Sequence, residues 1–283
     1  MISVAIPIFN RNVDQLVQQL LARLNFVDID FELLLWDDGS DQGFKTLNAA
    51  LARELDKVHY FEFTLNKGRS AARNRLAEQA KYDYILFLDN DVEVLGEDFF
   101  SLYLDQIQQR KAVIYGGITY PDYLPAADQF LRWKYERRKK KGQHPIRSFG
   151  ACNFMVKRSI MTAIPFDESL EQYGFEDTLW LKQVFKAGHT LTHIPNPVFC
   201  SELDDDATFF KKSDLAMQNL AKLYQSKHLM ASDGIRILEV YENFKAANRF
   251  WLSRALEKVL PFQLFPVQKL QLFKLNRLHQ YLK

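Results

Sequence analysis

Asp89-Asn90-Asp91 is the part of the sequence whose residue types and spacing point most directly to chemistry. It follows Tyr84–Leu88, a run of five apolar or aromatic residues that predicts a short buried strand. Side chains two positions apart on an extended segment point the same way, so Asp89 and Asp91 would repel one another unless a cation lay between them. Mg²⁺ and Mn²⁺ prefer such carboxylate oxygens and keep positions open for phosphates. The alternative is a solvated turn whose acids cap the next helix.

Two further polar clusters also follow apolar runs. Asp37-Asp38-Gly39-Ser40 comes after Phe31–Trp36, and its carboxylates could accept from an N–H of a base or from the backbone of a tight turn. The segment from Asn66 to Asn74 joins a predicted strand to a predicted helix. Its Arg69 and Arg73 are four residues apart and share a helix face, which suits an anionic ligand or an ordinary charged surface.

Gly174-Phe175-Glu176-Asp177 precedes a helical pattern over Thr178–Ala187. Acidic residues in a first helical turn interact favourably with the helix dipole, so capping alone explains them. A carboxylate at a helix N-terminus can also serve as a general base. The spacing does not separate these two roles.

The elements that must position these clusters alternate along the first half of the chain. Continuous apolar runs, which predict buried strands, are separated by helical patterns; the predicted strands are Ile2–Ile8, Phe31–Trp36, His59–Phe63 and Tyr84–Leu88, and the predicted helices are Asp14–Leu24, Phe44–Leu55 and Gly68–Ala80. This alternation predicts an α/β protein with a mostly parallel sheet covered on both faces. Ligands of such sheets bind beyond the carboxyl ends of the strands, where the polar clusters lie.

Length and composition exclude several classes of protein. The chain has 283 residues, of which 47% are hydrophobic and 25% charged, so it can bury a sizeable core and is not disordered as a whole. Its net charge of +2 argues against a nucleic-acid partner. Two cysteines are too few for a disulfide framework, and we find no signal peptide and no apolar run long enough to cross a bilayer. We therefore expect a cytoplasmic protein.

Beyond about Asp206 the strand patterns fade. Helical patterns follow over Ala207–Tyr224, Ile235–Leu260 and Val267–Lys283. Arg132–Lys141 carries seven basic residues and one acid, and Pro261–Lys283 is basic and amphipathic. Both segments are candidates for peripheral contact with the inner face of a membrane. The first is equally typical of a loop that meets an anionic acceptor or of a solvated helix face, and the second is equally suited to docking on its own domain or on the other subunit of a homodimer.

Taken together in chain order, these motifs resemble the inverting family 2 glycosyltransferases of the GT-A fold. The resemblance covers roughly residues 1–200, and it is carried by Pro7-Ile8-Phe9-Asn10, Asp37-Asp38-Gly39-Ser40, Asn66-x-Gly68-x-x-x-Ala72-Arg73-Asn74, Phe87-Leu88-Asp89-Asn90-Asp91, Phe166-Asp167-Glu168-Ser169 and Gly174-Phe175-Glu176-Asp177. It implies a Rossmann-like catalytic domain over residues 1–205 and a helical C-terminal extension over residues 206–283.

The resemblance also assigns roles. Asp37 matches the acid that bonds the nucleotide base, and Asp177, with Glu176 beside it, matches the catalytic base. Asp89 and Asp91 match the DxD pair, whose second acid usually ligates a Mn²⁺ or Mg²⁺ ion that bridges the diphosphate. The residues implied for binding of the nucleotide-sugar are Pro7, Phe9, Asn10, Asp37, Gly68, Arg73, Asp89 and Asn90.

The implied reaction moves a sugar from a nucleotide donor, which we expect to be linked to UDP, to a hydroxyl of a growing glycan or glycolipid. One departure from the family concerns a histidine that many members carry after the base motif. Here His193 lies too early on its strand, and we expect it to be structural.

Two other classes of protein remain as alternatives. In a haloacid-dehalogenase-like phosphatase, Asp89 would be the nucleophile and Asp91 the acid/base, but that motif belongs near the N-terminus and leaves Asp37 and Asp177 unexplained. A non-catalytic nucleotide- or carbohydrate-binding protein would keep Asp37 and Arg73 and need no base.

Overall fold

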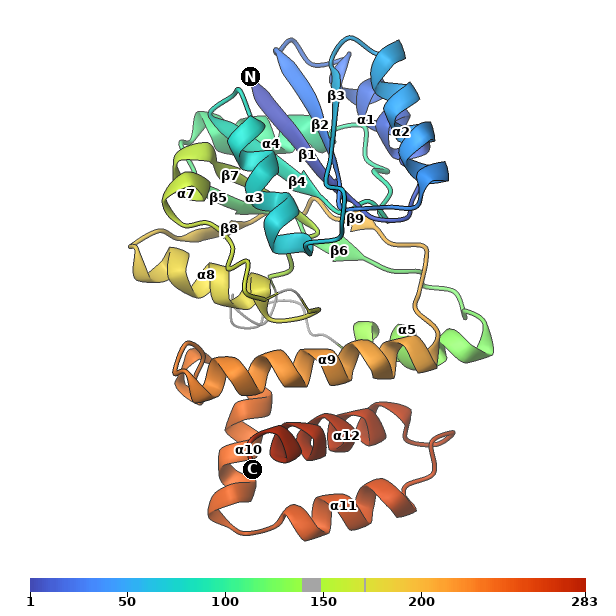
Figure 1. Ribbon diagram of the computed structural model, residues 1–283, viewed down its shortest axis with the longest axis vertical. Coiled ribbons are helices and arrows are strands. Elements are labelled where there is room, and N and C mark those ends of the chain that lie inside the picture. The colour runs from blue at the N-terminus through green and yellow to red at the C-terminus, as the bar shows by residue number, and fades with distance from the viewer. Residues whose placement is uncertain (139–148, 171) are drawn as a thin grey trace. The chain divides into compact units, whose positions relative to one another are not determined.

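The computed structural model describes residues 1–138, 149–170 and 172–283 (Figure 1). Its contacts divide the chain into two compact units. The first unit comprises Met1–Thr119, Phe149–Glu171 and Gln183–Glu202. The second comprises Tyr120–Ser148, Gln172–Lys182 and Leu203–Lys283. Each unit is therefore built from three separate stretches of the chain.

A seven-stranded sheet forms the centre of the first unit. Its strand order is β3-β2-β1-β4-β7-β5-β8. The strands are β1 (Ile2–Ile8), β2 (Phe31–Asp37), β3 (Val58–Glu62), β4 (Tyr84–Leu88), β5 (Val113–Tyr115), β7 (Asn153–Lys157) and β8 (Leu191–His193). Strands β3, β2, β1 and β4 are parallel, β7 runs antiparallel between β4 and β5, and β8 is parallel to β5. The predicted mostly parallel sheet is confirmed.

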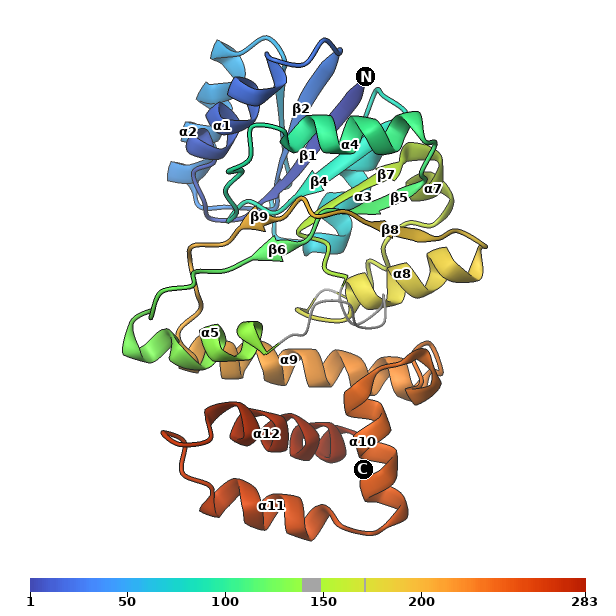
Figure 2. The same ribbon diagram turned by 180° about the vertical axis from the view of Figure 1, so that it is seen from behind.

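Helices cover both faces of this sheet. Figures 1 and 2 show α3 (Arg69–Gln79) and α7 (Arg158–Ala163) on one face, and α1 (Asp14–Leu24) and α4 (Phe99–Gln108) on the other. Helix α2 (Gln42–Glu54) packs against β3 at the sheet edge. The apolar residues of α1 recur at helical spacing and are buried against alternate residues of β1 and β2. The predicted bounds of this helix are confirmed. Those of β1 and β4 are confirmed too, because each of these strands is a continuous run of buried residues.

A short second sheet and one helix complete the strand-bearing part of the chain. Strand β6 (Ile118–Thr119) pairs in parallel with β9 (Val198–Phe199). Helix α8 (Glu176–Lys186) begins in the second unit, and its last four residues belong to the first.

The rest of the second unit is helical. It contains the short helices η1 (Ala127–Gln129) and η2 (Ala231–Asp233) and the helices α5 (Phe130–Arg137), α9 (Asp206–Gln225), α10 (Arg236–Ala246), α11 (Phe250–Val259) and α12 (Pro266–Tyr281). Helix α12 lies between α9 and α11 in both Figure 1 and Figure 2. The single helical pattern over Ile235–Leu260 is divided in two, because Asn248 adopts a left-handed conformation with φ of 50°.

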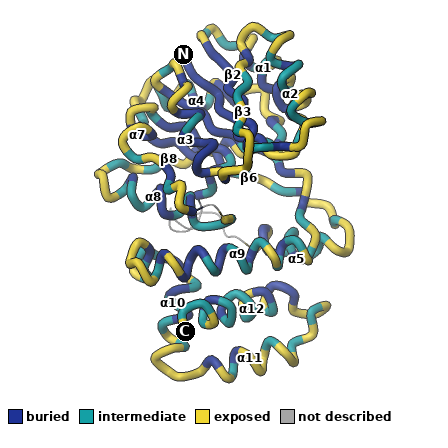
Figure 3. Tube along the Cα trace, viewed as in Figure 1, coloured by how far each residue is buried: buried dark blue, intermediate teal, exposed yellow. Residues whose placement is uncertain are grey.

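The amphipathic C-terminal segment docks within this unit. Leu131, Phe209, Val267 and Leu270 form one buried cluster from α5, α9 and α12. Figure 3 shows buried residues along α9 and α12, and exposed residues along much of α11. The apolar stripe of α12 is thus used for packing inside the second unit. Among the described residues, no helix is both long and apolar enough to cross a membrane.

The division into a catalytic domain over residues 1–205 and an extension over residues 206–283 concerns function. Packing units do not test it, and it stays a prediction.

Candidate functional site

The loops that follow β1 and β2 are joined to one another by hydrogen bonds. Asn10 follows β1 in a left-handed conformation with φ of 48°, which asparagine tolerates better than most residues. Its backbone N–H donates to the Ser40 hydroxyl at 2.8 Å, and its side-chain oxygen accepts from the Asp41 backbone N–H at 2.7 Å. These bonds fix the loops that carry the predicted nucleotide residues Asn10 and Asp37.

Asp38 ties the β2 loop to the start of α3. Its two carboxylate oxygens accept from the backbone N–H groups of Lys67 and Gly68, at 2.7 and 2.9 Å. Burial raises the pKa of Asp38, and the two backbone bonds oppose that rise. Gly39 has φ of 79°, and a Cβ there would lie 2.5 Å from the Asn66 backbone nitrogen, so the two loops approach too closely for a side chain.

Asp37 is fully buried at the end of β2. Its Oδ1 accepts from the Ser40 backbone N–H at 2.7 Å, while Oδ2 has no hydrogen bond among the described residues. The Tyr60 hydroxyl is a neighbour, because its pKa is raised by burial, by the charge of Asp37 and, to a smaller extent, by its hydrogen bond to that carboxylate. Asp37 Oδ2 is therefore a buried acceptor, and the Tyr60 hydroxyl also hydrogen-bonds this carboxylate. Of the other predicted residues of this pocket, Pro7 is buried and Phe9 is half exposed.

Arg73 connects α3 to the Asp-Asn-Asp motif after β4. The helix begins after Gly68, which has φ of 90°, and Arg73 is 1% exposed one turn into it. The Nη2 atom of Arg73 donates to Asp89 Oδ1 at 2.8 Å and to the Ala151 carbonyl at 3.1 Å. A buried guanidinium requires such a partner, because an uncompensated charge in the interior is costly.

Asp91 lies two residues further, and Asn90 between them is half-buried. Burial, and then the charge of Asp89, raises the pKa of the Asp91 carboxyl, while Arg69 and Arg11 lower it. Two neighbouring carboxylates with these hard oxygen donors fit a Mg²⁺ or Mn²⁺ ion. In the described part of the chain, no group of three or more His, Cys, Asp or Glu side chains is close enough to hold a metal. A cation here would therefore complete its coordination with water or phosphate oxygens.

Glu176 and Asp177 belong to the second unit, in the first turn of α8. Glu176 is buried, and its Oε2 accepts from the Gly174 backbone N–H at 3.0 Å. Asp177 is half-buried and accepts from the Thr178 backbone N–H at 2.6 Å. The two adjacent acids therefore differ: Glu176 is tied to the turn before the helix, and Asp177 caps the helix start.

The turn before Asp177 is supported by α9, which sequence reasoning missed. Gly174 has φ of 107°, and a Cβ there would lie 2.6 Å from the Ala216 Cβ. The buried side chain of Asn219 donates to the carbonyls of Gln172 and Gly174, at 2.9 and 3.1 Å. No local signal distinguishes Asn219 from other polar residues of a long helix, because its partners lie more than 40 residues away in sequence.

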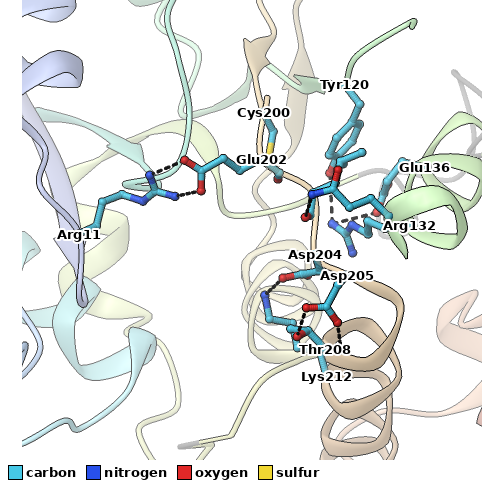
Figure 4. A network of polar contacts seen from close by, with 12 residues as sticks. Arg11, Tyr120, Arg132, Glu136, Cys200, Glu202, Asp204, Asp205, Thr208 and Lys212 are labelled. Atoms are coloured by element: carbon cyan, nitrogen blue, oxygen red, sulfur yellow. Dashed lines mark hydrogen bonds and ion pairs between the residues drawn. The ribbon is translucent and has the colours of Figure 1, made fainter. Parts of the chain in front are cut away.

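Figure 4 draws a set of polar contacts that includes members of both units. In the first unit, Arg11 pairs with Glu202, which lowers the pKa of Glu202. In the second unit, Arg132 pairs with Glu136 at 3.0 Å, and Lys212 pairs with Asp204 at 2.6 Å. Arg132 is therefore held in a structural ion pair. The last residues of the basic segment Arg132–Lys141 lie outside the described residues.

The structure thus brings most of the predicted nucleotide residues together in the first unit. Asn10, Asp37 and Gly68 are connected through the Asp37–Ser40 loop, and Arg73 is bonded to Asp89. Glu176 and Asp177 are described within the second unit, so their joint action with the nucleotide residues stays a prediction. His193 stacks on Tyr115 with ring centroids 5.3 Å apart, a packing contact.

Solved structures show which class of fold this sheet and its loops define. Mannosyltransferase PcManGT from Pyrobaculum calidifontis, in complex with GDP-Man and Mn²⁺, is 13% identical and has a TM-score of 0.62; the match covers 99% of this chain and 86% of that one. Residues 1–349 of S. aureus TarS, in complex with UDP, are 15% identical with a TM-score of 0.55, covering 99% and 91%. The fold is the predicted GT-A glycosyltransferase fold.

The family is shown by the sequence itself. Residues 3–164 match the model of Glycosyl transferase family 2, and the chain belongs to that family. The GalNAc(5)-diNAcBac-PP-undecaprenol beta-1,3-glucosyltransferase of Campylobacter jejuni is 24% identical over 242 residues, which is 82% of this chain and 76% of that protein. The teichoic acid poly(glycerol phosphate) polymerase of Staphylococcus epidermidis is 29% identical over 153 residues, but the match spans only 20% of its length.

The predicted family and enzyme class are confirmed, and the protein is a glycosyltransferase. None of these similar proteins supports a phosphatase or a non-catalytic binding protein.

Proposed function

We propose that the chain transfers a sugar from a UDP-linked donor to an acceptor hydroxyl, with inversion at the anomeric carbon and with the help of a divalent cation. The observation that carries this proposal is the Arg73–Asp89 pair at the carboxyl end of β4, with Asp91 close enough to Asp89 for the two charges to interact. A nucleotide-sugar has a base with N–H donors and an anionic diphosphate. Its site therefore needs hydrogen-bond acceptors near the base and cations near the diphosphate.

The nucleotide base is assigned to Asp37. Its Oδ2 has no hydrogen bond among the described residues, whereas both oxygens of Asp38 already accept backbone N–H groups. An N–H of uracil can donate to Asp37, with Pro7 near the end of β1 and with Phe9 and Asn10 on the loop that follows it. UDP in the TarS complex agrees with this base, and GDP-Man in the mannosyltransferase complex is the competing donor class.

The diphosphate is assigned to the cationic side of the same site. Asp91, together with Asp89, would hold Mn²⁺ or Mg²⁺, and the ion would neutralise charge that develops on the leaving nucleoside diphosphate. Arg73 orients Asp89 through the 2.8 Å bond, and it also contributes positive charge behind the motif. Gly68, at the start of α3, and Asn90, between the two acids, are assigned to the same diphosphate region.

Asp177 is assigned as the general base, with Glu176 fixing the turn that presents it. The Asp177 carboxylate would take the proton of the acceptor hydroxyl as that oxygen bonds to the anomeric carbon and the bond to the diphosphate breaks. One displacement from the opposite face of the sugar inverts the configuration. The acceptor is assigned to the class of glycans carried on lipid diphosphates, because the Campylobacter relative's name describes one. With such an acceptor, we propose that the enzyme works in the cytoplasm at the inner face of a membrane.

Calorimetric titration with UDP, GDP and dTDP, with and without Mn²⁺, tests the donor assignment. We expect UDP to bind more tightly with Mn²⁺, and Asp91→Asn to lose that gain. The matched control is Asp105→Asn, an exposed acid on α4 that should change nothing. Equal UDP affinity with and without metal would contradict the assignment.

A second variant separates binding from catalysis. We expect Asp177→Asn to bind UDP like the wild type and to lose about 10²- to 10⁴-fold in the rate of sugar transfer or of slow donor hydrolysis. A variant that transfers at the wild-type rate would exclude Asp177 as the base.

A further inference from the structure

Helix α11 carries a row of apolar side chains on its outward face. Trp251 and Val259 are 69% and 74% exposed, and the exposed Ala255 lies between them. These three residues are spaced by four, so they follow one side of the helix over about 12 Å. Trp is enriched where an apolar phase meets water. An exposed row of this kind indicates a docking surface.

The opposite face of α11 is already occupied inside the second unit. Phe250 is buried and stacks on His279 of α12, with ring centroids 3.6 Å apart, and Ser253 donates to Asn276. Helix α11 therefore keeps its outward row exposed while its inner face is packed. The loop that follows continues the apolar surface, with Leu264 at 67% and Phe265 at 41% exposure. Lys269 of α12 donates a hydrogen bond to the carbonyl of Leu260, where this loop begins.

The charge around this row is strongly one-sided. The last 35 residues, from Arg249 to Lys283, contain seven Lys or Arg residues and one acid, Glu257, which is a net charge of +6. Because the whole chain carries +2, the preceding 248 residues carry −4. Arg254 and Lys258 are exposed and flank the apolar row from the next positions on the helix. Two exposed cations of this basic segment therefore lie beside the apolar row, whereas Lys274 contacts Tyr135 of α5.

A cleft of about 310 Å³ between α11 and α12 adds to this cationic character. Three of its lining residues are basic, Arg254, Arg277 and Lys283, and Glu257 is the one acid among them. Glu257 is engaged by the Asn276 amide, and Arg277 is partly neutralised by Asp214 at 3.3 Å. The pKa of His279 is lowered by burial and then by Lys283 and Arg254, which shows that these cations act on the same region. A phosphate headgroup suits such a cleft.

We propose that α11 and the loop of residues 260–265 form a docking surface for an anionic phospholipid bilayer. An apolar row flanked by basic residues lies in the plane of a membrane interface, with the row in the acyl boundary and the cations among the headgroups. The complementary charge favours a lipid surface over a neutral protein partner. The inference does not depend on the sugar transferred, because the surface consists only of residues from the C-terminal helices.

Sedimentation of the full chain with vesicles tests this surface without any sugar donor. We expect binding to vesicles of phosphatidylcholine with phosphatidylglycerol, and much weaker binding to phosphatidylcholine alone. Raising the salt to 1 M shortens the Debye length to about 3 Å and should release most of the bound protein. Soluble glycerol phosphate at the same phosphate concentration should not compete, which distinguishes a bilayer from a free phosphate.

Paired variants separate the apolar and the charged contributions. Arg254→Gln with Lys258→Gln should weaken binding to anionic vesicles about 30-fold, since each basic residue near such a surface contributes about fivefold. Trp251→Ala should weaken it about tenfold, because less apolar area enters the interface. The matched controls lie in the first unit: Arg53→Gln removes an exposed charge, and Phe26→Ser removes a ring that is 90% exposed.

Three results would overturn the proposal. The first is no sedimentation with anionic vesicles, and the second is an equal loss in the controls and in the α11 variants. The third is a wild-type dimer in analytical ultracentrifugation that Trp251→Ala converts to a monomer while vesicle binding is unchanged, because a second copy of the chain would then cover α11. Donor titration is unaffected by each of these outcomes, so failure here is distinguishable from failure of the proposed activity.

Discussion

Asn219 is the residue whose replacement tests how the proposed base is positioned. Its buried amide donates to the carbonyls of Gln172 and Gly174, which flank the turn before Asp177. Within that turn Gly174 has φ of 107° and Phe175 has φ of 68°. A left-handed Phe is unfavourable, so the turn depends on surrounding contacts to persist. Asn219→Ala removes two of those contacts at once.

The expected loss of stability follows from the two hydrogen bonds. Each is a neutral bond that contributes about 1 kcal/mol net, so the free energy of unfolding should fall by about 2 kcal/mol. For a chain of this size that lowers the thermal midpoint by about 4 to 8 °C. Because misplacing a reacting group by 1 Å costs up to about 10²-fold, kcat should fall by tenfold or more. The affinity for UDP should be unchanged, since Asp37 and Arg73 belong to the first unit.

Differential scanning fluorimetry, steady-state kinetics and UDP titration measure these three quantities. Gln218→Ala is the matched control, because Gln218 is the neighbouring residue on α9 and its amide bonds the Tyr281 hydroxyl instead. We expect the control to lose less stability and to keep its kcat. An Asn219→Ala protein whose midpoint and kcat both match those of Gln218→Ala would refute the role of Asn219 in holding the turn.

Two further predictions concern the first unit. Gly39→Ala should weaken UDP binding in calorimetry and lower the unfolding midpoint, because φ of 79° and the adjacent loop backbone leave no room for a Cβ. Gly43→Ala, in α2 with no atom within 4 Å of the new Cβ, should keep both or gain about 0.5 to 1 kcal/mol of stability. Arg73→Met should destabilise the protein by about 3 to 5 kcal/mol in urea unfolding, since Asp89 loses its buried partner. Adding Asp89→Asn to it should recover part of that loss, and strictly additive losses would show that the two side chains are not coupled.

Much of the first unit could be predicted from local patterns. The apolar run Ile2–Ile8 and the helical spacing over Asp14–Leu24 each reflect one element that buries its own face, so their bounds match the observed strand and helix. Tyr84–Leu88 matches for the same reason. The polar clusters that follow β1, β2 and β4 lie at one edge of the sheet because these parallel strands end there.

What the sequence could not show depends on contacts between distant segments. The support of Gly174 by Ala216 and Asn219 joins residues more than 40 positions apart, and no periodicity encodes it. The break at Asn248 was also missed, because the apolar pattern continues through a residue whose φ is positive. The stripe of Pro261–Lys283 suited either a membrane or its own domain. Its buried contacts with Phe209 show that most of it packs internally, and they leave α11 as the exposed face.

In two pairs of neighbouring aspartates, the members differ in the hydrogen bonds that they already make, and this difference supports the proposed roles. Both oxygens of Asp38 are held by backbone N–H groups, whereas Asp37 Oδ2 has no backbone partner among the described residues, and this favours Asp37 as the proposed partner of the nucleotide base. Asp89 is likewise committed to Arg73, and burial beside it makes a bare negative charge on Asp91 unfavourable. Asp91 is therefore the member of its pair that gains most from a cation. In each pair one carboxylate stabilises the loop, and a fixed loop would let the other bind its proposed ligand without the entropy cost of ordering that loop first.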